Sequence, residues 1–196
     1  MKQGHRVRRA GPTVEQLEQE LYREKYRLRY RSILRSTIYA LIIVAAVSVL
    51  VATLLLPVLE IYGSSMAPTL NENDIVVSVK GGDIRQGDII AFYYNNRILI
   101  KRVIAVGGQT VDIDADGNVS VDGELLDEPY LTEKSAGESD LTYPYTVDPE
   151  TYFVMGDHRE TSVDSRNSLI GCIERSEIVG RIVWTVWPLS RFGRVG

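Results

Sequence analysis

Cysteine and histidine are scarce in this chain of 196 residues, which contains one cysteine and two histidines. The single cysteine, Cys172, excludes an intrachain disulfide, and no pair of cysteines has the spacing of metal ligands. The histidines, His5 and His158, are too few for a histidine-rich metal site. We therefore expect no metal ion and no cofactor. We expect Cys172 to be a small buried core residue, because it lies between Gly171 and Ile173.

Positive charge is also scarce beyond the first part of the chain. Residues 1–35 contain ten Lys or Arg and four Asp or Glu, whereas the remainder contains 12 and 22, a net charge of −10. This asymmetry argues against one uniformly charged globule. It predicts a basic segment, residues 1–35, that is distinct from the rest of the chain.

One long run without charge follows the basic segment. Residues 36–59, STIYALIIVAAVSVLVATLLLPVL, would form a helix about 35 Å long, enough to cross a hydrocarbon core about 30 Å thick. The alternatives are a buried helix of a soluble protein and a cleavable signal peptide, which has a shorter lead and a shorter apolar core. We predict an uncleaved transmembrane helix over 36–59, and no second run of this length follows it.

The flanks of this run predict its orientation. Six basic residues between 23 and 35 precede it, and Glu60 follows it directly. Because cationic flanks stay in the cytoplasm, residues 1–35 are predicted to be cytoplasmic and residues 60–196 extracytoplasmic. Residues 14–35 could form a helix on anionic headgroups, but we favour a solvated segment that only fixes the topology.

Beyond residue 60 the sequence predicts a mainly β domain. Short segments rich in β-branched and aromatic residues are bounded by turn residues, and no long amphipathic helix or internal repeat is visible. Two Asp-Gly pairs in DADGNVSVDGELL predict a hairpin, IERSEI (173–178) a helical turn, and residues 132–149 a polar loop. The predicted strands are residues 74–80, 88–94, 97–106, 109–113, 151–156 and 177–187.

Two residue types could supply chemistry in this domain. Ser64 and Ser65, in IYGSSMAPTL, directly follow the apolar run, and a serine nucleophile needs a base. Lys101 interrupts the apolar strand RILIKRVIAV, where strand parity places it with Leu99 and Val103 and opposite Arg102. Burial would bring its pKa from about 10.4 toward 8 at a cost of about 3 kcal/mol, as in lysines that act as general bases. The alternatives are turn serines and a lysine that reaches solvent or pairs with a carboxylate.

Three segments resemble the conserved motifs of bacterial type I signal peptidases, in the same order. They are GSSMAPTL (63–70), IKRVIAVGGQTV (100–111) and MGDHRETSVDSRNSLIG (155–171), and the preceding apolar helix also fits. The resemblance covers residues 36–196. It implies the family's extracytoplasmic β fold on a single transmembrane helix, in a bacterial cell membrane.

The resemblance assigns roles to individual residues. It implies Ser65 as nucleophile, with its backbone N–H facing the oxyanion, and Lys101 as general base. Some relatives have a serine at the position of Gly63, whose hydroxyl stabilises the oxyanion, and this chain lacks that hydroxyl. His158 lies where asparagine is common in the family, and we interpret it as a tolerated variation. The resemblance also implies that four residues support the site, namely Ser162, Asp164, Arg166 and Asp157. The alternative for residues 155–171 is a charged turn that only closes the domain.

The resemblance also implies a substrate. An extended peptide would add to the strand edges near Ser65 and Lys101, in shallow pockets that admit small side chains, as in Ala-x-Ala cleavage sites. Core packing is the alternative for each pocket residue. The predicted substrate-binding residues are Ile61, Gly63, Met66, Leu70, Leu99 and Ile100.

The sequence therefore predicts a membrane-bound serine endopeptidase that removes signal peptides from preproteins. Its partners would be preproteins and the lipid bilayer, with Trp184 and Trp187 either at the headgroups or in the core. A repressor-like Ser/Lys protein bound to nucleic acid is excluded by the membrane span. A relative with few dedicated substrates, or a catalytically silent peptide-binding domain, remains an alternative. The sequence does not indicate the oligomeric state.

Overall fold

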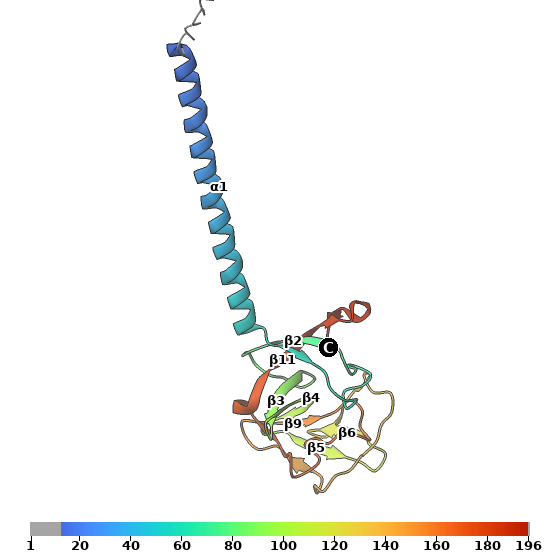
Figure 1. Cartoon of the computed structure of the whole chain (residues 1–196). Coiled ribbons are helices and arrows are strands. Elements are labelled where there is room, and N and C mark those ends of the chain that lie inside the picture. The colour runs from blue at the N-terminus through green and yellow to red at the C-terminus, as the bar shows by residue number, and fades with distance from the viewer. Residues whose placement is uncertain (1–12, 196) are drawn as a thin grey trace, which may run out of the picture. The chain divides into compact units, whose positions relative to one another are not determined.

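The structure, a computed structural model, describes residues 13–195, except for the side chains of residues 52–55 (Figure 1). The chain divides into two compact units, residues 1–51 and residues 52–196. His5 and the first twelve residues of the predicted basic segment lie outside the described residues.

The first unit contains most of one long helix, α1 (Val14–Leu55). No proline or glycine interrupts this stretch, and its side chains from residue 14 to 51 are all exposed. Residues 14–51 contain a stretch that is long and apolar enough to cross a membrane. The predicted helix over 36–59 is therefore present but differs at both ends. It continues back through residues 14–35, and it ends at Leu55 because Pro57 cannot continue a helix and disfavours helical geometry at the residue before it.

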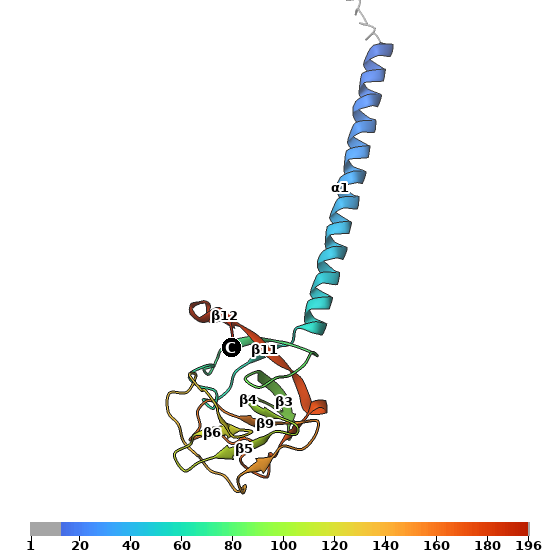
Figure 2. The same cartoon turned by 180° about the vertical axis from the view of Figure 1, so that it is seen from behind.

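The second unit is built on antiparallel β-sheets (Figures 1 and 2). Among the described residues, eight strands form the larger sheet in the order β1-β2-β11-β3-β4-β9-β10, with β12 paired to β11. Its strands are β1 (Val58–Glu60), β2 (Ile75–Val79), β3 (Ile89–Tyr94), β4 (Arg97–Val106), β9 (Thr151–Met155), β10 (Ile173–Glu174), β11 (Ile178–Trp187) and β12 (Gly193–Arg194). The mainly β fold is confirmed. The strands β1, β8, β10 and β12 were not predicted, because segments of two or three residues carry no alternating pattern.

The smaller sheet has the order β7-β6-β5-β8. Its strands are β5 (Thr110–Ile113), β6 (Val119–Val121), β7 (Glu124–Leu125) and β8 (Tyr145–Thr146). The predicted hairpin is confirmed, and Asp122 and Gly123 turn it with φ angles of +52° and +85°. The predicted helical turn is the 3₁₀ helix η1 (Arg175–Glu177), while the predicted loop over 132–149 contains β8.

The core of the second unit covers both faces of β3 and β4. Ile89 and Ala91 belong to one cluster with Val76 and Ile182, whereas Ile90 and Phe92 belong to another with Val103 and Val154. A third cluster joins the smaller sheet to the ends of β4 and β9. Two covered faces explain why DIIAFYY is a continuous apolar run with no alternation. Cys172 is half-buried against the third cluster and not fully buried as predicted.

A buried ion pair also lies in this unit. The Arg159 guanidinium contacts the Glu128 carboxylate, and both side chains are completely buried. Arg159 Nε also donates to the Gly156 carbonyl, at 3.1 Å. Removing one partner of such a pair leaves an uncompensated buried charge.

We predict that Arg159→Gln lowers the free energy of unfolding by about 3–5 kcal/mol, because Glu128 would lose its buried partner. The matched control is Arg181→Gln, whose partner is Asp88 and whose side chain is 43% exposed. This control should change the free energy of unfolding by about 1 kcal/mol or less. Urea titration of the full chain in detergent, followed by tryptophan fluorescence, measures both. Equal effects of the two substitutions would contradict the prediction.

Candidate active site

Ser65 lies in the loop between β1 and β2, residues 61–74, which we call the Ser65 loop. Both ends of this loop are joined, because Ile61 N donates to Asp74 O at 2.8 Å and Asn73 N donates to Ile61 O at 2.9 Å. Met66, directly after Ser65, is buried in the core and leaves Ser65 half-buried. Gly63 has a φ of +82°, a conformation that other residues rarely adopt, so the backbone itself requires glycine there.

Lys101 lies in the middle of β4, between β3 and β9. Its side chain is 3% exposed, and its Nζ donates to Ser162 Oγ at 2.9 Å. Burial lowers the pKa of Lys101 to about 8, against the opposing effect of the Asp164 carboxylate. The predicted parity is confirmed, because Leu99 and Val103 belong to the core cluster on one face of β4 and Ile100 to the cluster on the other.

Ser65 and Lys101 line the same cleft, which has a volume of about 700 Å³. Most of the predicted substrate-binding residues line it too, namely Ile61, Gly63, Met66, Leu99 and Ile100. Leu70 is the exception, because it is completely buried and packs in the core. The cleft has further lining residues that the sequence did not indicate, namely Val58, Leu59, Glu60, Tyr62, Arg97 and Ile98.

Asp157 connects β4 to the Ser65 loop. Arg102 Nε and Nη2 donate to the two oxygens of its carboxylate at 2.9 and 2.8 Å, and both side chains are buried. The hydroxyl of Thr69 donates to the same carboxylate. Arg102 was not singled out from the sequence, although its place on the face of β4 opposite Lys101 predicted a separate environment.

Asp164 and Arg166 hold the loop that carries Ser162. Arg166 donates to both oxygens of Asp164, at 2.8 and 2.9 Å, and neither side chain is exposed. Asp164 also accepts a hydrogen bond from Gly156 N at 2.9 Å, and Arg166 Nη2 donates to the Ser162 carbonyl at 3.2 Å. The pair therefore holds the backbone of Gly156 and the carbonyl of Ser162, the partner of Lys101.

Gly156 allows the loop that carries Ser162 to lie against the Ser65 loop, a role that the sequence did not indicate. A Cβ at this position would lie 2.2 Å from Ser162 Oγ and 2.5 Å from the Ser65 carbonyl oxygen. The same carbonyl accepts a hydrogen bond from His158 N at 3.0 Å. The ring Nδ1 of His158 lies 2.9 Å from the hydroxyl of Thr161. His158 thus contacts Ser65 through its backbone N–H, and the interpretation of its side chain as a tolerated variation stays a prediction.

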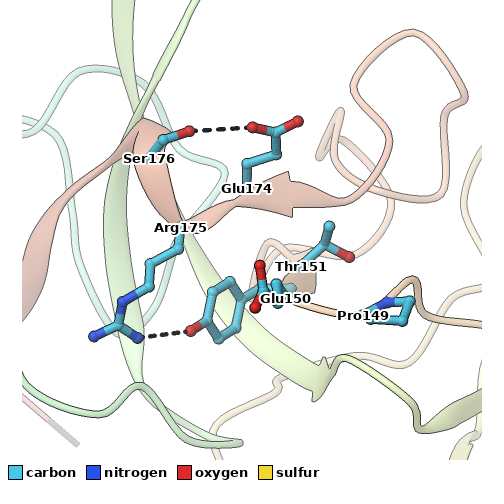
Figure 3. Close-up of a pocket in the computed structure, with 7 residues that line it drawn as sticks. Pro149, Glu150, Thr151, Glu174, Arg175 and Ser176 are labelled. Carbon is cyan, nitrogen blue, oxygen red and sulfur yellow. Dashed lines mark hydrogen bonds between the residues drawn. The ribbon is translucent and has the colours of Figure 1, made fainter.

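A second hollow of about 700 Å³ lies beside β9 and β10 (Figure 3). Several of its polar side chains bind other protein groups: Arg175 donates to the hydroxyl of Tyr152 and to the Gly82 carbonyl, and Ser176 donates to Glu174. This hollow shares no lining residue with the cleft of Ser65 and Lys101. Within residues 13–195, no group of three or more His, Cys, Asp or Glu side chains could hold a metal ion.

The family model and the named relatives that match this chain agree on one family. A family model described as signal peptidase, peptidase S26, matches residues 34–187. Signal peptidase I P of Bacillus subtilis subsp. natto is 38% identical over 155 residues, which cover 72% of this chain and 83% of that protein. Signal peptidase IB of Staphylococcus aureus (strain COL) is 35% identical over 152 residues, covering 67% and 78%. A crystal structure of a signal peptidase I from Enterococcus faecalis V583 is 28% identical, covers 51% of this chain and 97% of that one, and has a TM-score of 0.44.

The burial of Lys101 predicts a pH-dependent effect on stability. The pKa of Lys101 is about 8 in the folded chain, whereas its ordinary value is 10.5. Between these two pH values Lys101 is therefore mostly neutral in the folded chain and mostly protonated in the unfolded chain. Below pH 8 the folded protein bears the full cost, about 3 kcal/mol, and the cost disappears as the pH rises to 10.5.

We therefore predict that Lys101→Met gains stability relative to wild type below pH 8 and that this gain shrinks by about 3 kcal/mol between pH 8 and 10.5. Urea unfolding of both proteins across this pH range measures the gain. Lys80→Met, at an exposed lysine, controls for the loss of a lysine charge. A difference between wild type and Lys101→Met that does not change with pH would contradict the predicted burial cost.

Proposed function

Because this chain belongs to the signal peptidase family, peptidase S26, we propose that it cleaves signal peptides from exported preproteins with Ser65 and Lys101 as its catalytic dyad. The family is one of serine peptidases, and its named relatives are signal peptidases. The observation that carries the dyad is that Ser65 and the buried Lys101 line one cleft, and that burial lowers the pKa of this lysine to about 8.

The lowered pKa supports Lys101 as the general base. At pH 7 about one chain in ten would hold a neutral amine, against about one in several thousand at the ordinary lysine value. The hydrogen bond to Ser162 Oγ restricts the Lys101 amine, and Ser162 is in turn held by the Asp164–Arg166 pair. Ser162, Asp164, Arg166 and Asp157 thus have a positioning role in this proposal.

The reaction follows from these groups. Neutral Lys101 takes the proton from the Ser65 hydroxyl as Oγ bonds to the carbonyl carbon of the scissile peptide. The backbone N–H of Ser65 stabilises the oxyanion, and collapse breaks the C–N bond while the Lys101 ammonium returns its proton to the leaving amine. Water then attacks the carbonyl carbon of the acyl-enzyme while Lys101 accepts its proton. The bond between this carbon and Ser65 Oγ breaks, the Lys101 ammonium returns the proton to Oγ, and the signal peptide leaves with a new carboxyl terminus.

The cleft supports cleavage after small residues. Its lining residues Ile61, Met66 and Leu99 are apolar, and Met66 is 2% exposed. An extended peptide lying along β1 and the start of β4 would place alternate side chains against these residues. We propose small side chains one and three residues before the cut, the Ala-x-Ala pattern of secretory signal peptides.

The lipid bilayer is the proposed second partner. Helix α1 contains a stretch long and apolar enough to span it, and its side chains from residue 14 to 51 are exposed in the structure. The basic residues before the stretch favour a cytoplasmic amino terminus and an extracytoplasmic β domain. Trp184 and Trp187 are 39% and 53% exposed, which supports contact with headgroups more than a place in the core.

We predict that Ser65→Ala and Lys101→Ala each lower the rate of preprotein cleavage at least about 10³-fold, because each removes one half of the dyad. Ser64→Ala is the matched control, since Ser64 is the adjacent exposed serine and has no role in the proposed chemistry. The measurement is cleavage of a preprotein with an Ala-x-Ala site by the full chain in detergent, with the new amino terminus identified by mass spectrometry.

Equal cleavage by wild type, Ser65→Ala and Lys101→Ala, or none by any of them, would contradict the proposed dyad. Cleavage of only a few preproteins from a broad panel would favour a peptidase with dedicated substrates. Binding of signal peptides by all variants without cleavage would favour the catalytically silent alternative.

A further inference from the structure

Arg191 reaches the Ser65 loop from the carboxyl-terminal end of the chain. It ends the short 3₁₀ helix η2 (Leu189–Arg191), which joins β11 to β12 (Figure 2). The family match ends at residue 187, so Arg191 lies outside it. Its Nη2 donates to the carbonyls of Pro68 and Thr69, at 3.0 and 2.8 Å. Its Nη1 forms an ion pair with Asp74 Oδ2 at 2.9 Å.

These contacts fix two parts of the Ser65 loop at once. Pro68 and Thr69 are the third and fourth residues after Ser65, and Asp74 is where the loop enters β2. The Asp74 side chain is 3% exposed, and it also accepts a hydrogen bond from Asn71 N at 2.8 Å. Thr69 is thus bound through its carbonyl by Arg191 and through its hydroxyl by Asp157.

The segment that carries Arg191 is itself held in place. Arg191 N donates to the Pro188 carbonyl at 2.9 Å, and Val195 N donates to the Val183 carbonyl at 3.1 Å. The rings of Trp184 and Phe192 pack with their centroids 5.4 Å apart. Strand β11 is also paired with β2 and β3. The segment that carries Arg191 is therefore anchored to the larger sheet.

We propose that Arg191 is a positioning residue for Ser65. This inference rests on the proposed function, in which Ser65 must meet both the Lys101 amine and the scissile carbonyl. A displacement of about 1 Å at a reacting group can lower a rate about 100-fold. The contacts of Arg191 with the residues after Ser65 therefore affect turnover, although Arg191 does not touch substrate. A planar guanidinium presents its donors from separate nitrogens in a fixed plane, so Nη2 meets the two carbonyls while Nη1 faces the carboxylate. The ammonium of lysine offers all its donors from a single nitrogen and does not match this spacing.

We predict that Arg191→Ala lowers kcat for signal-peptide cleavage about 10- to 100-fold, with KM changed less than about threefold. Arg191→Lys should recover only a small part of the loss. Arg194→Ala is the matched control, because Arg194 is exposed and lies on the same hairpin, and its activity should equal that of wild type. All variants are compared as full chains in detergent with one preprotein.

Two further readouts separate positioning from a general loss of structure. Hydrogen exchange of the amides of residues 66–74 should become faster in Arg191→Ala than in Arg194→Ala, while the strands β3 and β4 exchange as in wild type. Added guanidinium ion at millimolar concentration should restore part of kcat to Arg191→Ala but not change Arg194→Ala, with equal sodium chloride as the salt control.

A wild-type chain that cleaves together with an Arg191→Ala variant whose kcat equals that of Arg194→Ala would overturn the role of Arg191 and leave the proposed function intact. A fall in kcat accompanied by faster exchange throughout β3 and β4 would also overturn it, because the effect would then be loss of structure. Failure of wild type itself to cleave would overturn the proposed function. The exchange data would then report only whether Arg191 holds the Ser65 loop in place.

Discussion

The desolvation of one amine is the constraint on which the rest of the site depends. Lys101 lies on a central strand with neighbours on both sides, its side chain is 3% exposed, and burial lowers its pKa to about 8. At neutral pH this placement costs the fold about 3 kcal/mol. A domain of this size bears such a cost only because the surrounding sheet buries large apolar clusters on both faces of β3 and β4.

The partners of the buried cations explain why Lys101 differs from its neighbours. Arg102, Arg159 and Arg166 each contact a buried carboxylate, which keeps their charge compensated. Lys101 instead donates to the neutral hydroxyl of Ser162. A carboxylate in that place would favour the ammonium and raise its pKa, whereas a hydroxyl leaves desolvation dominant. The three ion pairs thus hold the loops in place. Lys101, whose partner is neutral, is the one of these four side chains that has a role in the proposed chemistry.

Part of this organisation could be predicted from the sequence and part could not. The strand 97–106 and its parity followed from RILIKRVIAV alone, and Lys101 was notable because a charge interrupts an apolar strand. Glu128 could not be paired with Arg159, because the two are distant in sequence and no local pattern links them. Leu70 was indistinguishable from a pocket residue, since an apolar side chain in a loop gives no indication of which way it packs. Arg191 lies beyond the recognisable motifs, and only the folded hairpin brings it to the Ser65 loop.

The pH dependence of kcat/KM for signal-peptide cleavage tests the central claim most directly, because it reports the ionisation of the essential base in the free enzyme. If Lys101 must be neutral to activate Ser65, kcat/KM rises with pH on an acid limb whose apparent pKa is about 8, the value that burial gives this lysine. An acid limb at the ordinary lysine value of 10.5, or a rate that does not change between pH 6 and 10, would contradict the account.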